Sequence, residues 1–146
     1  MTMMRLITAL LLATFAYGAC AADVSPGNWE ITVTMRVPGV PQAFGPYSRN
    51  QCLQANDTKD PGRVFGALPG AGTCKFGNRN DTGSRYSFTV SCGGVFPMTG
   101  NGSVNYSVQS MNGELVLGAT LPSPEGGAPQ KVDTRSELSA RRTGGC

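Results

Sequence analysis

The positions of the five cysteines limit most strongly what this chain can fold into. Cys20 lies at the edge of an apolar N-terminal segment, and four more follow it: Cys52, Cys74, Cys92 and Cys146. No two of them have the close spacing of a zinc-ligating pair, and the chain contains no histidine. Because exported thiols tend to oxidise, the last four cysteines predict a domain that is stabilised by two disulfides.

The N-terminus has the pattern of a secretory signal. Arg5 precedes an apolar run over residues 6–16, and small residues follow that run. A membrane-spanning helix needs roughly 20 apolar residues, which neither this run nor any later segment supplies. The pattern therefore predicts export, and it does not predict a transmembrane protein.

Two processing outcomes are compatible with the end of this signal. Small residues precede Ala22 and favour cleavage there, whereas cleavage before Cys20 would place a lipid anchor on that cysteine. We expect a signal peptide over residues 1–21, with Cys20 as the alternative lipidation site. The remaining residues 22–146 are long enough for one domain with one core.

Alternating apolar and polar residues predict antiparallel strands along this domain. In the clearest case Trp29, Ile31 and Val33 alternate with polar residues, which places Trp29 in the core. Residues 132–140 repeat the pattern near the C-terminus, and many glycines and prolines mark turns between strands. We predict an all-β fold, a single curved antiparallel sheet or small open β-barrel, in which the first strand lies beside the last.

The segment from residue 74 to residue 92 is predicted to form a hairpin. Its alternation places Cys74 opposite Cys92 and Asn80 opposite Tyr86. Directly opposed positions of an antiparallel pair lie within disulfide range. Four cysteines allow three connectivities, and this register favours the Cys74–Cys92 bridge. That choice leaves Cys52 to pair with Cys146.

A second hairpin is predicted around the dipeptide Asn112-Gly113. This pair is preferred in type I′ turns, which would fix the register of the flanking strands. Counting outward from the turn pairs Tyr106 with Ala119 and places the apolar residues of both strands on one face.

Several kinds of chemistry are excluded by residues that the chain lacks. Without histidine, no Ser/His/Asp or Cys/His mechanism is available. The carboxylate pairs Asp57 with Asp60 and Asp133 with Glu137 fit a solvated surface better than acid/base catalysis. We therefore predict a protein that is not an enzyme and has no metal site and no cofactor. The net charge of +3 gives no reason to expect nucleic acid as a partner.

Five short motifs follow one another along nearly the whole domain. They are PGNWEITVTM at 26–35, CL at 52–53, CK at 74–75, SC at 91–92 and RRTGGC at 141–146. In this order they resemble a family of exported bacterial proteins, domain-of-unknown-function family 3617. The resemblance implies the periplasm or cell envelope of a Gram-negative bacterium, and it carries no known activity or site residues.

The sequence leaves three classes of function open. The leading expectation is a non-enzymatic envelope protein that binds a small apolar ligand on the concave side of the sheet, against residues such as Tyr106, Val108 and Leu117. The alternative is a protein-interaction or structural module whose partner is another envelope protein. The third is an enzyme that relies on carboxylates without histidine or thiol chemistry.

Overall fold

The computed structural model describes residues 24–58, 60–65, 74–94, 97–123 and 126–146. The predicted signal peptide and Cys20 lie outside the described residues. The strands are β1 (Gly27–Arg36), β2 (Phe44–Leu53), β3 (Cys74–Asp81), β4 (Arg85–Cys92), β5 (Met98–Tyr106), β6 (Ser110–Leu121) and β7 (Gln130–Gly144), and the helix is α1 (Pro61–Phe65). Within the described part of the chain, no helix is long and apolar enough to cross a bilayer.

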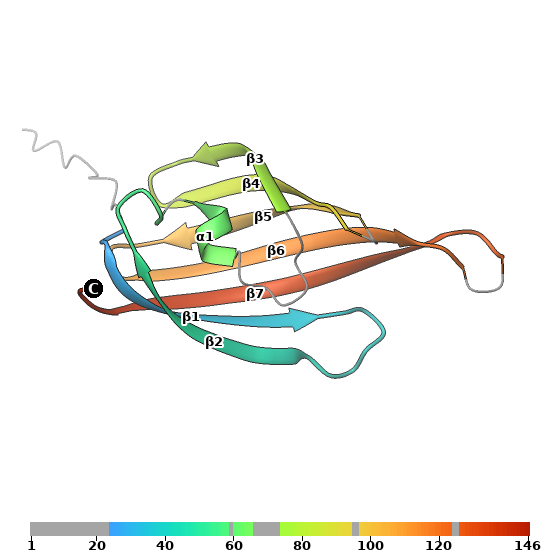
Figure 1. Ribbon diagram of the computed structural model, residues 1–146, viewed down its shortest axis with the longest axis horizontal. Coiled ribbons are helices and arrows are strands. Elements are labelled where there is room, and N and C mark those ends of the chain that lie inside the picture. The colour runs from blue at the N-terminus through green and yellow to red at the C-terminus, as the bar shows by residue number, and fades with distance from the viewer. Residues whose placement is uncertain (1–23, 59, 66–73, 95–96, 124–125) are drawn as a thin grey trace, which may run out of the picture.

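The strands form one antiparallel sheet in the order β2-β1-β7-β6-β5-β4-β3 (Figure 1). The predicted all-β fold is confirmed, and β1 lies beside β7 as expected. The sheet is open, however, because β2 continues it beyond β1 and β3 continues it beyond β4. Although β1 pairs with β7, the sheet does not close on itself, and β2 and β3 are its two edge strands.

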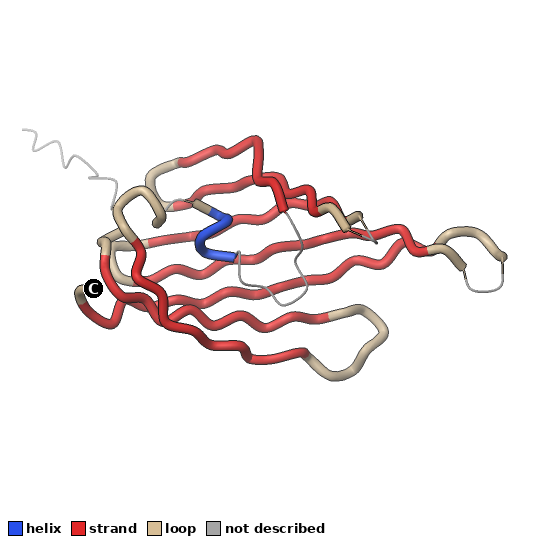
Figure 2. The backbone as a smooth tube through the Cα atoms, in the orientation of Figure 1, coloured by secondary structure: helices blue, strands red, loops and turns tan. Residues whose placement is uncertain are grey.

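One face of the sheet carries the hydrophobic core. On β1, Trp29, Ile31 and Val33 are buried, and the residues between them are partly exposed. This alternation confirms that Trp29 belongs to the core. The helix α1 lies over the same face (Figure 2), and its residues Val64 and Phe65 are buried against it. The opposite side, which we call the outer face, is mostly polar.

The outer face is crossed by two ion pairs between neighbouring strands. Arg141 of β7 contacts Glu30 of β1, with 2.5 Å between Nη2 and Oε2. Arg135 of β7 contacts Glu114 of β6, with 2.9 Å between Nη2 and Oε1. Because these side chains are largely exposed, each pair contributes at most about 1 kcal/mol.

Both predicted disulfides are present. Cys74 and Cys92 occupy opposed positions on β3 and β4, with their Cα atoms 4.0 Å apart. Cys52 of β2 is bonded to Cys146, which follows β7, with a Cα–Cα distance of 5.7 Å. Because β1 lies between β2 and β7, the second bridge ties the edge strand to the end of the chain across an intervening strand.

The register of the first hairpin differs from the prediction beyond Gly77. Asp81, rather than Asn80, lies opposite Tyr86, because the register shifts between Gly77 and Asn80. At this irregularity Asn78 has a positive φ of 47°, a conformation that asparagine adopts more readily than most residues. A β-bulge adds one residue to one strand, and alternation alone does not reveal it.

The predicted turn of the second hairpin is wrong. Asn112-Gly113 lies inside β6, and Tyr106 faces Met111 instead of Ala119. The turn is formed earlier by Ser107 and Ser110, whose Oγ atoms are 2.7 Å apart. The Ser107 N–H also donates to the Ser110 carbonyl at 2.8 Å. Hydroxyl groups that bond to nearby backbone close such a turn without asparagine or glycine at its centre.

Gly113 serves packing rather than a turn. A Cβ atom at this position would lie 2.9 Å from Val104 Cγ2 and 3.1 Å from Phe65 Cζ. The absence of a side chain therefore lets Phe65 of α1 approach the sheet closely. Its ring centroid lies 5.7 Å from that of Phe88 on β4.

Candidate functional site

The structure does not bring the predicted ligand-contacting residues together. Tyr106 and Leu117 are buried core residues, whereas Val108 is exposed on the turn between β5 and β6. Tyr106 Oη donates a hydrogen bond to Asp81 at 2.5 Å, and its strand position faces Met111. These three residues do not line one cavity, so the predicted location of the site is wrong.

The first predicted carboxylate pair supports the segment around α1. Asp57 Oδ2 accepts a hydrogen bond from the Gln54 N–H at 3.1 Å, and its Oδ1 lies 3.4 Å from Arg63 Nε. The Asp60 carbonyl accepts hydrogen bonds from the N–H groups of Arg63 and Val64 at 3.0 and 3.1 Å. These contacts give both residues a structural role at the start of the helix.

The second carboxylate pair lies on the outer face of β7. Asp133 Oδ1 is 3.8 Å from Lys131 Nζ. Glu137 lies opposite Glu114 of β6. Residues four apart along a strand are separated by roughly 13 Å, too far for one water to join both carboxylates.

A cleft of about 460 Å³ lies between the β1–β2 connection and strands β6 and β7. Residues 37–43 of the connection form one side, where Val37, Val40 and Ala43 supply apolar surface. Val116 of β6 adds an apolar group on the opposite side. Small-molecule sites commonly have volumes of about 300–1,000 Å³ and combine apolar walls with a few polar groups. This cleft has both properties.

Two arginines give the cleft its charge. Arg36 and Arg135 line it, and they are directly paired positions of β1 and β7. Arg135 forms an ion pair with Glu114, and the lining residue Asp133 forms an ion pair with Lys131. No ion pair joins Arg36 to another described residue. Like charges on directly opposed strand positions repel, so an anion between the two guanidinium groups would be stabilised.

Sequence reasoning missed this cleft because its parts are far apart in the chain. Arg36 and Arg135 meet only through the pairing of β1 with β7. One signal was visible: residues 37–48 contain no charged side chain and include three prolines. Such a composition predicts a connection between strands, and it does not indicate which strands the segment lies against.

A second cleft on the outer face, of about 450 Å³, has a different character. It is lined mainly by polar residues, among them Arg85, Ser103 and Glu114. Arg85 Nη2 donates a hydrogen bond to Ser103 Oγ at 2.9 Å, so its guanidinium group is already engaged. This cleft lacks the apolar wall that the first one has, and the first one is the better candidate for an organic ligand.

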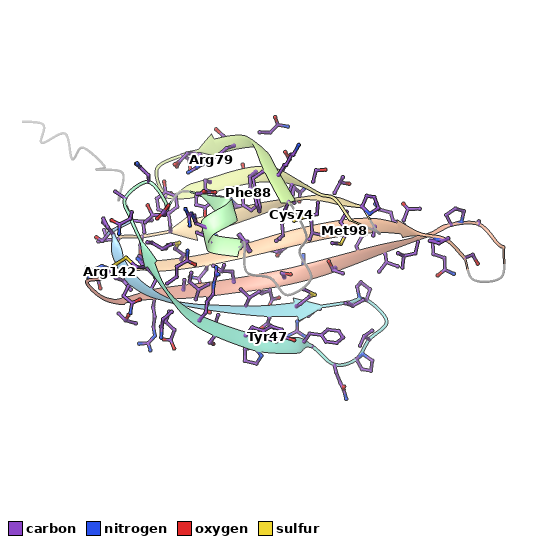
Figure 3. All side chains as sticks on the ribbon, viewed as in Figure 1. Tyr47, Cys74, Arg79, Phe88, Met98 and Arg142 are labelled. Carbon is purple, nitrogen blue, oxygen red and sulfur yellow. A yellow bond between two sulfur atoms is a disulfide. The ribbon has the colours of Figure 1, made fainter. Side chains whose placement is uncertain are left out.

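The core contains a buried phenol outside both clefts. Tyr86 is fully buried, and no described residue forms a hydrogen bond with its Oη atom. Arg79 of β3 (Figure 3) lies over its ring, with the guanidinium carbon 5.2 Å from the ring centroid. Burial raises the pKa of Tyr86 above its ordinary value; Asp60 and Asp81 add to the increase, and Arg79 opposes it.

This phenol predicts an alkaline loss of stability. The unfolded chain releases the Tyr86 proton above about pH 10, whereas the folded chain retains it, so the free energy of unfolding should fall by up to about 1.4 kcal/mol per pH unit. Tyr86→Phe should remove this contribution and, near pH 7, leave stability unchanged or raised by about 1 kcal/mol. Urea denaturation of both proteins at pH 7 and above pH 10 measures the difference. An equal alkaline loss in both would contradict the assignment.

The comparisons with known proteins place the chain in a family. A family model described as "Protein of unknown function (DUF3617)" matches residues 24–146. The chain therefore belongs to this family, and the resemblance found in its motifs is confirmed. No curated protein and no solved structure matches the chain.

Proposed function

We propose that this member of the DUF3617 family is a non-enzymatic binding protein of the periplasm or cell envelope of a Gram-negative bacterium. The N-terminal pattern of a charged residue, an apolar run and small residues supports export. The two disulfides support an oxidising compartment, since such bonds persist there and are rare in the cytosol.

The ligand we propose is a small amphipathic anion held in the cleft beneath the β1–β2 connection. The observation that carries this proposal is the combination of an apolar wall with two arginines at paired positions, Arg36 and Arg135. Apolar surface suits a hydrocarbon or aromatic body. Guanidinium groups suit a carboxylate, phosphate or sulfonate head, which Arg36 can bind through two parallel hydrogen bonds and Arg135 through the N–H groups that Glu114 does not occupy. This chemistry replaces the purely apolar ligand expected from the sequence.

The proposal that the protein is not an enzyme is supported by how its acidic residues are used. Asp57 holds the turn before α1, and Asp133 is paired with Lys131. General acid/base catalysis needs groups positioned to exchange a proton with a substrate. In the cleft, Asp133 is the sole carboxylate among the described lining residues.

The cleft predicts binding of anilinonaphthalene sulfonate, a probe with an aromatic body and an anionic head. The Arg36→Gln/Arg135→Gln double variant should bind it about tenfold or more weakly, because hydrogen bonds to charged groups are each worth about 1.5–3 kcal/mol. Fluorescence titration measures the dissociation constant. Uncharged phenylnaphthylamine should be much less affected by the same substitutions, since it has no anionic head.

The matched control for this titration is Arg85→Gln, which removes an arginine from the outer face at a position outside the proposed site. It should bind the probe as the parent protein does. Equal weakening in the control and the double variant would point to nonspecific attraction by net charge. Native mass spectrometry of protein purified from its own envelope would then show whether an organic anion is released on unfolding. A chain that carries no such mass would count against the proposed function.

A further inference from the structure

The clefts of the outer face adjoin one another. A third cleft, of about 280 Å³, lies between the two already described. It shares Val116 and Asp133 with the cleft beneath the β1–β2 connection, and it shares Asn101 with the polar cleft over β4, β5 and β6. The three clefts therefore form one groove, which we call the outer groove. It crosses the outer face from the β1–β2 connection to β4.

The register of the sheet places one row of side chains along the outer groove. Strands β1, β7, β6, β5 and β4 lie side by side in this order (Figure 1). Directly paired positions of these strands join, in sequence, Arg36, Arg135, Val116, Asn101 and Thr89. Each of the five lines one or two of the three clefts. Since neighbouring strands lie about 4.8 Å apart, the row is roughly 19 Å long.

The chemistry of this row changes from one end to the other. It begins with two cations, Arg36 and Arg135, continues with the apolar Val116, and ends with the amide of Asn101 and the hydroxyl of Thr89. Both polar residues are exposed, and no described residue forms a hydrogen bond with either side chain. An amide and a hydroxyl group each donate and accept hydrogen bonds. The far end of the row therefore suits a ligand group that does both.

The charged groups beside this polar end already have partners. Glu114 and Asp133 each form an ion pair with a basic residue of β7. Arg85 Nη2 donates a hydrogen bond to Ser103 Oγ at 2.9 Å. A second charge on the ligand would have to compete with these contacts, whereas uncharged hydroxyl groups would not. Strands β4 to β7 are paired on both sides, so they offer no free backbone groups to an extended peptide either.

We propose that the ligand of the cleft is an anionic glycoside, whose sugar lies against Asn101 and Thr89. This inference rests on the proposed function, in which Arg36 and Arg135 bind the anionic group. The apolar body of the ligand then passes over Val116, at the point where the first and third clefts meet. The hydroxyl groups of an uncharged sugar donate and accept hydrogen bonds, as the two side chains at the end of the row do.

Two fluorescent naphthoates test this proposal: 6-methoxy-2-naphthoate, and the same acid with a β-glucosyl group in place of the methyl group. We expect the parent protein to bind the glucoside about tenfold more tightly, because two hydrogen bonds between uncharged groups together have roughly that effect. Thr89→Val/Asn101→Leu should bind both compounds with the affinity that the parent has for the methoxy compound. Retention of that affinity also shows that the variant is folded. Fluorescence titration measures the dissociation constants.

Asn105→Leu is the matched control, since it makes the same change on the same face of β5, outside the three clefts. It should keep the preference for the glucoside. The proposal is overturned, and the proposed function is left standing, if the parent binds both compounds equally or if the control loses the preference as the double variant does. If the parent binds neither compound, or if Arg36→Gln/Arg135→Gln binds 6-methoxy-2-naphthoate as the parent does, the proposed function fails and this inference fails with it.

Discussion

Replacing Cys52 and Cys146 together by serine is expected to lower the free energy of unfolding by about 4.7 kcal/mol in the chain-entropy model. The bridge joins residues 94 positions apart, so its loss gives the unfolded chain a large increase in conformational freedom. Domains are stable by only about 5–15 kcal/mol, so this variant should lose a large share of its stability. Guanidinium denaturation of the oxidised parent and the double variant measures the difference.

The second disulfide supplies the control for this prediction. Cys74 and Cys92 are 18 positions apart, and replacing both by serine should cost about 3 kcal/mol in the same model. The ratio of the two losses in free energy of unfolding therefore tests whether the stabilisation by a disulfide grows with the length of the loop that it closes. A larger cost for the shorter loop would show that burial of Cys92, which is 2% exposed, outweighs the entropy of the unfolded chain.

The Cys52–Cys146 variant should also show where the sheet is weakest. Edge strand β2 pairs with β1 alone, and the bridge connects it to the segment after β7. Without the bridge, β2 keeps its ladder with β1 and the hydrogen bonds from Arg49 Nη2 to the carbonyls of Arg63 and Val64, at 3.0 and 3.4 Å. Amide hydrogen exchange should therefore increase first in β2, because edge strands open at a lower free energy than central ones.

The parts of the fold that the sequence predicted well rest on long, regular patterns. Trp29, Ile31 and Val33 alternate without interruption, and the structure buries all three. The Cys74–Cys92 bridge was predictable because alternation around both cysteines placed them opposite each other. The remaining pair then followed by elimination, although nothing in the sequence indicated that it would cross β1.

The errors arise where a local signal competes with tertiary packing. Asn112-Gly113 has the composition of a type I′ turn, yet Gly113 is needed where Phe65 approaches the sheet. The turn forms instead at residues 107–110, where the hydroxyl groups of Ser107 and Ser110 bond to each other. Turn propensity depends on four consecutive residues only. The free energy gained by burying an aromatic ring of a distant helix outweighs it.

The candidate site was harder to predict than the fold, because it depends on register. Arg36 and Arg135 become neighbours only when β1 pairs with β7 in one particular alignment. A shift by one residue would move one of them to the core face, where a guanidinium group could not be accommodated without a partner. The sequence shows that residues 37–43 carry no charge, but it does not show which strand surface this segment lies against.

Gly100→Ala is the second substitution expected to have a large effect. A Cβ atom at Gly100 would overlap the carbonyl oxygen of Val116 and would lie 3.0 Å from the Cα of Leu117. Because both are backbone atoms of the neighbouring strand β6, no side-chain rotation can relieve the overlap. Strands β5 and β6 must separate locally, and we expect a loss of about 3 kcal/mol. Urea denaturation of the parent and the variant measures this loss.

Gly118→Ala is the matched control, since Gly118 also lies in the β5–β6–β7 part of the sheet. A Cβ atom there would meet Asp133 Oδ1 at 2.7 Å, the end of an exposed side chain that can rotate away. This variant should stay within about 0.5 kcal/mol of the parent. If the two alanine variants lose equal stability, the loss of glycine flexibility rather than backbone overlap governs both positions. A large loss at Gly100 alone would show that β5 and β6 approach each other too closely there for any side chain.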